Sequence, residues 1–377
     1  MLEALAQAAA PRGPVEVLTP YLWTLGVSLG VTMLVMPIVR TIAIAGEIYD
    51  LPDAGLKPHE KPVPYLGGVG MYLGWAGAMA WSAAAFPASR GLLLTILLGG
   101  TMMMLTGLID DLRDIRPRTK LVLQLAVAAV LIVGGVGDRV AGLFLSYLPW
   151  HAPDWLVTLL SAGITVFILM GAGNATNLID GLDGLCSGVI GIISVGFVVI
   201  AAHLAAHEFS PTGDPVRMVV SVALLGACLA FLRYNFNPAQ MFMGDAGSLL
   251  LGFNAAVLIL LFAERDKPRW FIGALMVFAL PAFDTALAIA RRWLNGRALF
   301  TGDRSHFYDQ LRQRGMSVRR TVLISYALAS FYAAVGCTVL LVRARFAVLI
   351  FAGVLLLTAW AVLRLGMLRR DTDSAAG

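Results

Sequence analysis

The sequence predicts an all-α fold, a polytopic membrane helix bundle of about eleven transmembrane helices. Composition is the first reason: of 377 residues, 59% are hydrophobic and only 14% are charged, whereas soluble domains are about 25% charged. The mean hydropathy is correspondingly high, at +0.80. The second reason is that the sequence lacks the alternating apolar and polar residues of a membrane β-barrel, so helices are expected to satisfy the backbone hydrogen bonds in lipid.

Apolar runs follow one another along most of the chain, and a spanning helix needs about 20 apolar residues. The fourth run is shorter than the others. We therefore expect an extracytoplasmic segment at 1–18, a transmembrane domain at 19–364 and a cytoplasmic tail at 365–377. The predicted spans are residues 19–42, 67–86, 91–109, 121–136, 156–173, 184–203, 218–233, 248–263, 271–290, 322–342 and 346–364.

Basic residues predict the orientation, because cytoplasmic loops carry an excess of Lys and Arg. If the N-terminus lies outside, most of the 28 Lys and Arg residues fall in inside segments, above all in 110–120 and 291–321. An odd number of spans then places the C-terminus inside. The net charge of +5 follows mostly from this bias and also suits anionic lipid head groups.

Six aspartates lie at the ends of these apolar runs or within them. A carboxylate in a membrane segment costs roughly 2.5–3.5 kcal/mol on insertion scales, so it usually has a function and a partner. The predicted orientation places all six at or near the inside face, where they would repel one another unless a cation lay among them. They are Asp110, Asp111, Asp180, Asp183, Asp245 and Asp284.

Two of these motifs indicate binding or catalysis. In the Asp110-Asp111 pair, repulsion raises the pKa of one carboxyl group or recruits a cation, and a deprotonated member can act as a general base. The alternative is a solvated helix end. Residues 174–183 carry Asn and Asp at every third position, which on a helix places them along one side. That mixture suits a nucleobase, a ribose or a hydrated metal ion, and the alternative is a polar loop with capping side chains. The four residues are Asn174, Asn177, Asp180 and Asp183.

Three further segments carry candidate phosphate or metal contacts. Asp245 lies between glycines at the start of a predicted helix, where it could hold Mg²⁺ bridged to phosphate or serve as a simple N-cap. Lys57 and Lys61 lie in a basic, proline-rich stretch that is either a phosphate site or an ordinary inside anchor. Arg304 and His306 could contact a diphosphate or lie on a solvated helix.

Together, in this order, the motifs resemble the polyprenyl-phosphate N-acetylhexosamine-1-phosphate transferases of glycosyltransferase family 4. That superfamily includes undecaprenyl-phosphate GlcNAc-1-phosphate transferases and phospho-N-acetylmuramoyl-pentapeptide transferase. The resemblance extends from about residue 48 to residue 317. It rests on the paired aspartates at 110–111, the Asn-x-x-Asn-x-x-Asp-Gly-x-Asp-Gly-Leu run at 174–185, Asn235 ahead of Met-Gly-Asp-x-Gly-Ser at 243–248, and Pro281-x-x-Asp284.

One loop departs from the family pattern. GlcNAc-type members carry Asp-Arg-x-His-x-His-His there, and the muramoyl type carries a His triplet. This chain reads Asp-Arg-Ser-His-Phe-Tyr-Asp at 303–309, so only His306 remains. The departure argues against the muramoyl-pentapeptide enzyme and leaves the sugar nucleotide open. Tyr308 and Asp309 either replace the two imidazoles or mark a different donor.

The resemblance implies transfer of N-acetylhexosamine-1-phosphate from a UDP-sugar to undecaprenyl phosphate, with release of UMP, as a first membrane step of cell-envelope glycopolymer synthesis. It implies Mg²⁺, with Mn²⁺ as a possible substitute, and a multi-pass protein of the inner (cytoplasmic) membrane whose site faces the cytoplasm. A homodimer is possible and no nucleic-acid partner is expected. An ion- or proton-coupled transporter, a CDP-alcohol phosphotransferase and an inactive scaffold are the alternatives. The transporter predicts acids at mid-span, and the CDP-alcohol enzyme predicts an Asp-Gly-x-x-Ala-Arg signature that residues 180–184 lack.

The same resemblance suggests a division of roles. Asp245 and Asp111 are the expected metal ligands. Asp110, with Asp111 and His306, is assigned to catalysis, with Asp110 activating the lipid phosphate as a general base or through the metal. The expected nucleotide and substrate contacts are Asn177, Asp180, Asp183, Asn235, Lys57, Lys61 and Arg304.

Overall fold

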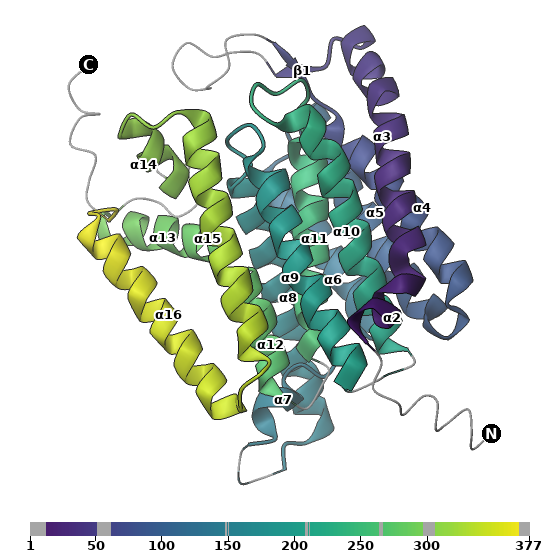
Figure 1. Ribbon diagram of the computed structural model, residues 1–377, viewed down its shortest axis with the longest axis vertical. Coiled ribbons are helices and arrows are strands. Elements are labelled where there is room, and N and C mark those ends of the chain that lie inside the picture. Colours follow the sequence, from purple (N-terminus) through teal and green to yellow (C-terminus); the bar gives the residue numbers. More distant parts are fainter. Residues whose placement is uncertain are drawn as a thin grey trace.

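The computed structural model describes residues 13–50, 62–147, 149, 151–207, 210, 212–263, 267–296 and 306–368. Within these residues the chain folds as a helix bundle whose long helices run roughly side by side (Figure 1). A single two-stranded sheet pairs β1 (Tyr49–Asp50) with β2 (Val63–Pro64) in antiparallel fashion. The all-α prediction is therefore confirmed.

A helix overlaps each predicted span. Eight are long and apolar enough to cross a membrane, or nine if one bent pair is counted as a span, in the part of the chain described. The predicted total of eleven also needs α4 and α6, and it remains a prediction. The helices are α2 (Pro14–Leu18), α3 (Leu22–Ala45), α4 (Gly67–Ala85), α5 (Arg90–Arg113), α6 (Pro117–Val133), α7 (Gly142–Leu145), α8 (Asp154–Leu178), α9 (Leu185–His207), α10 (Gly213–Asn235), α11 (Gly244–Ala263), α12 (Pro268–Val277), α13 (Ala279–Leu294), α14 (Phe307–Gln313), α15 (Val318–Val339) and α16 (Ala344–Arg364).

Helix α11 forms the centre of the bundle. Every residue from Ala246 to Ala263 is buried, because α4, α5, α8, α9, α10 and α12 all pack around it. After Asp245 its sequence is apolar on all sides except at Ser248 and Asn254, which is typical of a helix enclosed by others. Of the surrounding helices, α4, α5, α8, α9 and α10 expose large apolar side chains on their outer faces, as lipid-facing helices do.

Two glycines let neighbouring helices approach the start of α11 closely. A Cβ atom on Gly107 of α5 would lie 2.3 Å from the backbone oxygen of Asp245, and one on Gly68 of α4 would lie 2.2 Å from the backbone nitrogen of Gly247. Real Cβ atoms do not approach this closely, so only glycine fits without a shift of the helices. Asp245 is thereby held against the C-terminal end of α5.

The predicted span 271–290 contains a sharp bend, and its crossing of the membrane as one span stays a prediction. It consists of α12 and α13, which are bent by 71° at Phe278. Pro281 supplies the physical reason, because its ring nitrogen cannot donate the helical hydrogen bond to the carbonyl of Val277. The bend turns α13 away from the bundle axis, beneath α14 (Figure 1).

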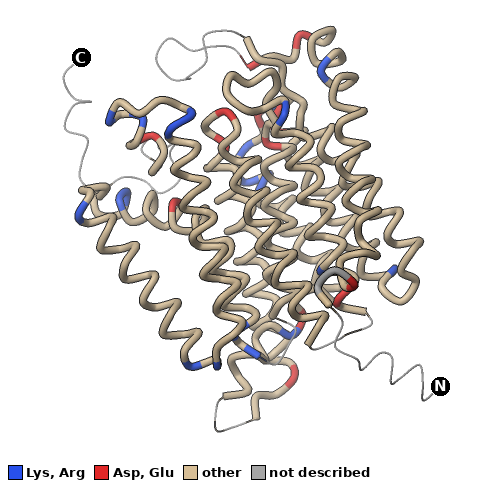
Figure 2. The backbone as a smooth tube through the Cα atoms, in the orientation of Figure 1, with Lys and Arg blue, Asp and Glu red and all other residues tan. Residues whose placement is uncertain are grey.

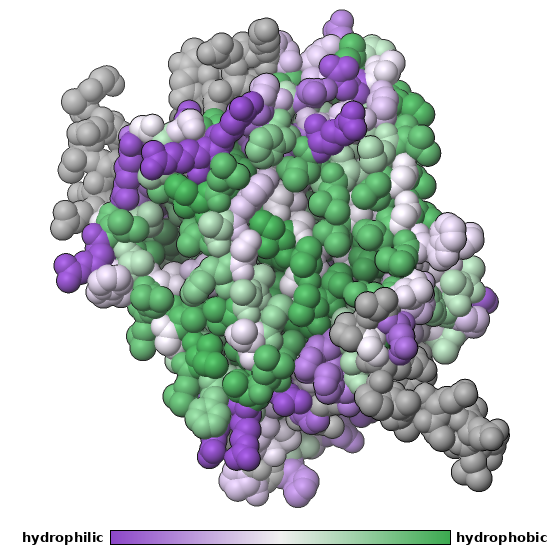
Figure 3. All heavy atoms as spheres, viewed as in Figure 1, coloured by the Kyte–Doolittle hydropathy of each residue, from purple (hydrophilic) through white to green (hydrophobic). Residues whose placement is uncertain are grey.

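Charged residues gather at the two ends of the bundle, with a long uncharged zone between them (Figure 2). The surface in Figure 3 shows the same division, with an apolar belt between hydrophilic ends. At one end lie the end of α5, the start of α6, the α8–α9 turn, the α10–α11 loop and α14. The predicted motifs within the described residues therefore meet at this end. The molecule is an integral membrane protein.

Candidate active site

Side chains from four helices converge where α11 begins. α5 contributes Asp110 and Asp111 from its last turn, and α6 contributes Lys120 from its first. Asn177 comes from the end of α8, and Asp245 from the first turn of α11. These five side chains are joined by hydrogen bonds or ion pairs, directly or through the backbone of α11. They form the acid cluster, the name used below for Asp110, Asp111, Lys120, Asn177 and Asp245.

Lys120 links two of the predicted acids. Its Nζ lies 2.7 Å from Oδ2 of Asp110 and also donates to Oδ2 of Asp245. The side chains of the three are 18%, 15% and 29% exposed, so the charges are only partly screened by solvent. Sequence reasoning did not select Lys120. A signal was present, because a cation in the first turn of a helix opposes the helix dipole and needs another reason to be there.

The two adjacent aspartates have different partners. Asp111 Oδ1 accepts from the backbone N–H of Asp245 at 2.7 Å, and its Oδ2 accepts from that of Ala246 at 3.0 Å. Asp111 therefore caps the N-terminus of α11, where a carboxylate also complements the helix dipole. Asp110 instead faces Lys120 and accepts from the backbone of Ile115 at 3.0 Å. Asp245 does not cap its own helix, so its carboxylate remains directed at the cluster.

Asn177 orients Asp245. Its Nδ2 donates to Oδ1 of Asp245 at 2.7 Å and to Oγ of Ser248 at 3.0 Å. For residues 174–183 the sequence left a helix face and a polar loop as alternatives, and the structure divides the segment between them, with Asn174 and Asn177 on α8. α8 ends at Leu178, and Asp180 and Asp183 lie in the turn before α9. The glycines at 181 and 184 explain the break, since Gly184 adopts a φ of +76°.

Asp180 is half-buried beside the acid cluster. No described residue forms a hydrogen bond or an ion pair with its carboxyl group. Burial, followed by the negative charges of Asp245, Asp111 and Asp183, raises the pKa of Asp180 to about 8. A cation or a donor from a ligand would lower the cost of ionising this group. Its predicted contact with a nucleotide stays a prediction.

Asp183 and Asn235 hold the α10–α11 loop. Oδ2 of Asp183 accepts from Nδ2 of Asn237 and from the backbone N–H of Ala239, both at 2.9 Å. Asn235 is 2% exposed. Its Oδ1 accepts from the Gly184 N–H at 3.0 Å, and its Nδ2 donates to the Met241 carbonyl at 3.1 Å. The structure thus gives both side chains a positioning role, and their predicted substrate contacts are untested.

His306 lies beside the cluster rather than in it. Its Nδ1 lies 2.7 Å from Oδ2 of Asp284, and Oδ1 of Asp284 accepts from the Phe307 N–H at 2.8 Å. His306 is 3% exposed, so in this structure the pair is enclosed. Asp284 ties α13 to the start of α14. Lys57, Lys61 and Arg304 lie outside the described residues.

The two residues that replace the family's imidazoles have structural partners. Oδ2 of Asp309 accepts from the backbone N–H of His306 at 3.1 Å, in a capping box at the start of α14. The hydroxyl of Tyr308 donates to the Leu178 carbonyl at 2.9 Å, which joins α14 to the end of α8. A role for these side chains in donor selection therefore has no support from their contacts.

The donor atoms around Asp245 suit a hard divalent cation. Mg²⁺ is usually held by one or two protein carboxylates, with waters and substrate phosphates completing its shell. Asp245 and Asp180 supply such carboxylates at the hydrophilic end of the bundle where the motifs meet. Among the described residues no three acid, His or Cys side chains are arranged to hold an ion by themselves. Asp245 and Asp180 would hold such an ion together with waters and substrate phosphates.

Comparison with known proteins matches this region to a family. Residues 93–263 match the model of glycosyl transferase family 4. A Bacillus subtilis (strain 168) protein named probable undecaprenyl-phosphate N-acetylglucosaminyl 1-phosphate transferase is 31% identical over 310 residues, which cover 81% of each chain. The chain belongs to glycosyl transferase family 4. The matched residues contain the whole acid cluster and the α10–α11 loop.

Two other relatives show the breadth of the family. The decaprenyl-phosphate N-acetylglucosaminephosphotransferase of Mycolicibacterium smegmatis is 32% identical over 342 residues, covering 84% of this chain and 81% of the relative. The phospho-N-acetylmuramoyl-pentapeptide-transferase of Heliobacterium modesticaldum is 31% identical over 304 residues, covering 78% and 89%. Names alone do not select the donor, since relatives of similar identity use different sugar phosphates.

Proposed function

We propose that this protein transfers N-acetylhexosamine-1-phosphate from a UDP-sugar to a polyprenyl phosphate, undecaprenyl phosphate being the expected acceptor, and releases UMP. The observation that carries the proposal is the acid cluster, in which Lys120 joins Asp110 to Asp245 at one end of a membrane bundle. Family membership and the names of the relatives support the same reaction class. Clustering of the acids at one end, rather than at mid-span, disfavours a proton-coupled transporter.

The reaction joins two anionic phosphates, and this sets what the site must do. An oxygen of the prenyl phosphate attacks the sugar-bearing phosphorus of the donor, and the bond from that phosphorus to the bridging oxygen of UMP breaks. Phosphoryl transfer depends on positioning and charge neutralisation more than on covalent catalysis. Lys120 supplies a cation at the cluster, and the half-buried setting strengthens its attraction for phosphate oxygens. Asp110 holds that ammonium group in place.

Mg²⁺, or Mn²⁺ in its place, is the proposed cofactor, held by Asp245 with Asp180 as a second carboxylate and Asp111 beneath it at the helix start. When bound, such a cation neutralises diphosphate oxygens and stabilises a leaving phosphate. Asn177 fixes the rotamer of Asp245 through its 2.7 Å hydrogen bond. The His306–Asp284 pair positions α14 at the rim of the site.

The finer parts of the proposal concern donor, location and assembly. A UDP-N-acetylhexosamine is the proposed donor, since two of the relatives above are named for N-acetylglucosamine. The proposed setting is the inner membrane, with eleven spans, an N-terminus outside and the acid cluster facing the cytoplasm, where soluble nucleotides are found. A homodimer remains part of the proposal.

Release of UMP tests the proposed reaction directly. Purified protein in detergent is incubated with undecaprenyl phosphate, Mg²⁺ and each of several UDP-sugars, and UMP is measured together with the lipid product. UMP formation that requires both the lipid phosphate and a UDP-N-acetylhexosamine supports the proposal. UMP formation without the lipid acceptor, or none with any UDP-sugar, overturns it.

A further inference from the structure

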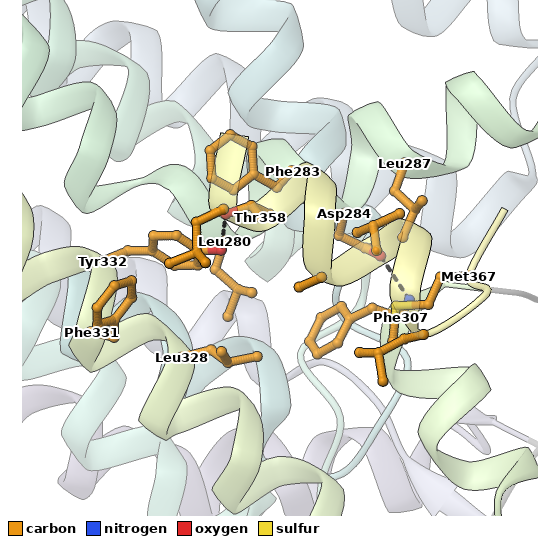
Figure 4. Close-up of a pocket in the computed structure, with 14 residues that line it drawn as sticks. Leu280, Phe283, Asp284, Leu287, Phe307, Leu328, Phe331, Tyr332, Thr358 and Met367 are labelled. Carbon is orange, nitrogen blue, oxygen red and sulfur yellow. Dashed lines mark hydrogen bonds between the residues drawn. The ribbon is translucent and has the colours of Figure 1, made fainter. Parts of the chain in front are cut away.

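An apolar groove lies between α13, α15 and α16, away from the acid cluster. Its cavity volume is about 280 Å³. Figure 4 shows its side chains converging from the three helices, with Phe283 and Leu287 on α13, Phe331 on α15 and Met367 after the end of α16. The acid cluster lies on α5, α6, α8 and α11, and α16 packs on α12 and α15 instead. The groove thus lies on helices other than those of the acid cluster, and it shares Asp284 with the His306–Asp284 pair beside that cluster.

The lining of this groove selects a hydrocarbon ligand. Only three lining residues have polar side chains, namely Asp284, Tyr332 and Thr358, and each has its partner within the protein. The hydroxyls of Tyr332 and Thr358 lie 2.9 Å apart and bond to each other. Oδ2 of Asp284 bonds to Nδ1 of His306, and its Oδ1 accepts from the N–H of Phe307 at the start of α14. A polar ligand would find no group to pair with, whereas a hydrocarbon chain would gain about 0.8 kcal/mol per buried CH₂.

The groove opens sideways, toward the lipid. Leu328, Phe331 and Leu357 line it and are also 36%, 45% and 53% exposed. They belong to the apolar belt that faces the bilayer, so a lipid chain can enter without crossing water. α16 is the least enclosed of the candidate spans, with 11% of its apolar window buried. The space between α15 and α16 is therefore one that a bilayer lipid can reach.

The end of the groove beside α14 is basic. Arg314 donates from Nη2 to the carbonyl of Leu365 at 2.7 Å, and Leu365 itself lines the groove. Arg364 is exposed and its guanidinium lies 5.7 Å from the ring centre of Trp360, an arrangement typical of a membrane interface. Arg312 adds a third positive charge on α14. A hydrophilic rim lies above the apolar surface here (Figure 3).

We propose that this groove holds an acyl chain of an anionic phospholipid from the surrounding bilayer, whose phosphate lies at Arg314 and Arg364. Charge decides between phospholipids, because a basic rim favours a lipid with net negative charge over a zwitterionic one by about 1 kcal/mol per cation near the surface. The site goes beyond the proposed transfer reaction and does not depend on it. The bound lipid would tie α16 to α13 and α14.

Photo-crosslinking locates the chain in the unmodified protein. The full-length protein in detergent micelles is mixed with phosphatidylglycerol that carries a diazirine on an acyl chain, and adducts are mapped by mass spectrometry. Adducts concentrated at 328–332 and 357–362 are expected. An even distribution over the exposed face of α16, including Leu349 and Leu356, would show an unspecific lipid annulus and overturn the proposal.

Matched variants test the groove and its rim by native mass spectrometry with phosphatidylglycerol and phosphatidylcholine of equal chain length. Ala361→Trp fills the groove and should weaken phosphatidylglycerol binding by about tenfold or more. Ala359→Trp, on the same helix but outside the lining, should change it by less than about twofold. Equal effects of both variants, or none from Ala361→Trp in protein with unchanged size-exclusion and thermal unfolding profiles, would contradict the site.

The rim is tested separately by removing charge. Arg314→Gln with Arg364→Gln should abolish the preference for phosphatidylglycerol over phosphatidylcholine, while Arg345→Gln, at the opposite end of α16, should retain it. Equal binding of both lipids to the unmodified protein would overturn the anionic headgroup. Displacement of phosphatidylglycerol by undecaprenyl phosphate, but not by another anionic phospholipid, would assign the groove to the acceptor and likewise overturn the proposal.

Discussion

At the scale of single residues, one lysine of the acid cluster determines how two of its aspartates interact. Without Lys120, the carboxylates of Asp110 and Asp245 would repel each other across the start of α11. With it, one ammonium group bridges the two carboxylates and offsets part of their negative charge, in a setting less than one third exposed. These side chains are held in place before any ligand binds, and a phosphate that enters competes for the same ammonium group. Substitutions of Asp245 and Lys120 therefore test the proposed roles of the cluster most directly.

Asp245→Asn should abolish transfer while leaving the protein folded. The amide keeps the size of the side chain and can still accept from Asn177, but a neutral oxygen is a poor ligand for Mg²⁺. UMP release measures the effect, and circular dichroism and size exclusion check the fold. Asp138→Asn, at the opposite end of the bundle, is the matched control. Full activity of Asp245→Asn, or of the unmodified protein in EDTA, would remove the metal assignment.

Lys120→Gln should reduce turnover by about a hundredfold or more, because phosphate contacts that strengthen in the transition state are worth about 2.7 kcal/mol or more when lost. The glutamine can still donate to Asp110, so the loss reports charge rather than a missing hydrogen bond. Arg118→Gln, an exposed neighbour in the first turn of α6, controls for the general positive charge of this segment. Normal turnover in Lys120→Gln would limit the lysine to a structural role.

At the scale of elements, α11 carries Asp245, and the elements around it fix where that side chain lies. Asp111 from α5 caps the helix, and the glycines at 68 and 107 let α4 and α5 close on its first turn. The function of the adjacent aspartates is thus divided between a helix cap and the charged cluster. This division predicts different phenotypes for two chemically identical substitutions.

Asp111→Asn should lower the thermal unfolding midpoint, since one amide cannot accept with both of its terminal atoms from the N–H groups of Asp245 and Ala246. Loss of such a cap costs about 0.5–2 kcal/mol. Asp110→Asn should leave the midpoint close to that of the unmodified protein and reduce turnover instead. Unfolding followed in detergent by intrinsic fluorescence compares the two. The reverse ranking of stabilities would show that the cap assignment is wrong.

Gly107→Ala should destabilise the bundle and displace Asp245 together. The added methyl group would lie 2.3 Å from the backbone oxygen of Asp245, so α5 and α11 must separate, and overpacking of this kind costs about 1–3 kcal/mol. Gly163→Ala on α8, where nothing lies within 4 Å of the added atom, is the control and should be neutral. Equal stability and equal activity of the two variants would refute the close-approach argument.

At the scale of the whole molecule, the sequence correctly predicted the features that depend on local pattern, which are the positions of the long helices and of one helix start. Hydropathy located a helix at every predicted span, and the glycine-flanked Asp245 was correctly placed at a helix start. The sequence did not predict contacts between residues far apart in the chain. No local pattern shows that Lys120 donates to Asp245, 125 residues away, or that Asp111 caps a helix from another segment. The break between α12 and α13 was missed because hydropathy continues across it, although Pro281 marks it. The predicted span ended at residue 173, and hydropathy did not show that α8 continues to Leu178 because its last turn carries polar Asn side chains.

The last prediction concerns the orientation of the bundle in the membrane, because the orientation decides which side of the membrane the motif loops face. Gln313, exposed on α14, lies at the end that carries the acid cluster, and His151 lies in the loop between α7 and α8 at the other. A cysteine is placed at each position in a chain with Cys337→Ser; Cys186 and Cys228 are buried. If most Lys and Arg residues face the cytoplasm, an impermeant maleimide should label the cysteine at 151 in intact cells and the one at 313 only in inverted vesicles. Labelling in the reverse order would place the acid cluster outside, where UDP-sugars do not reach it, and would contradict both the topology and the proposed donor.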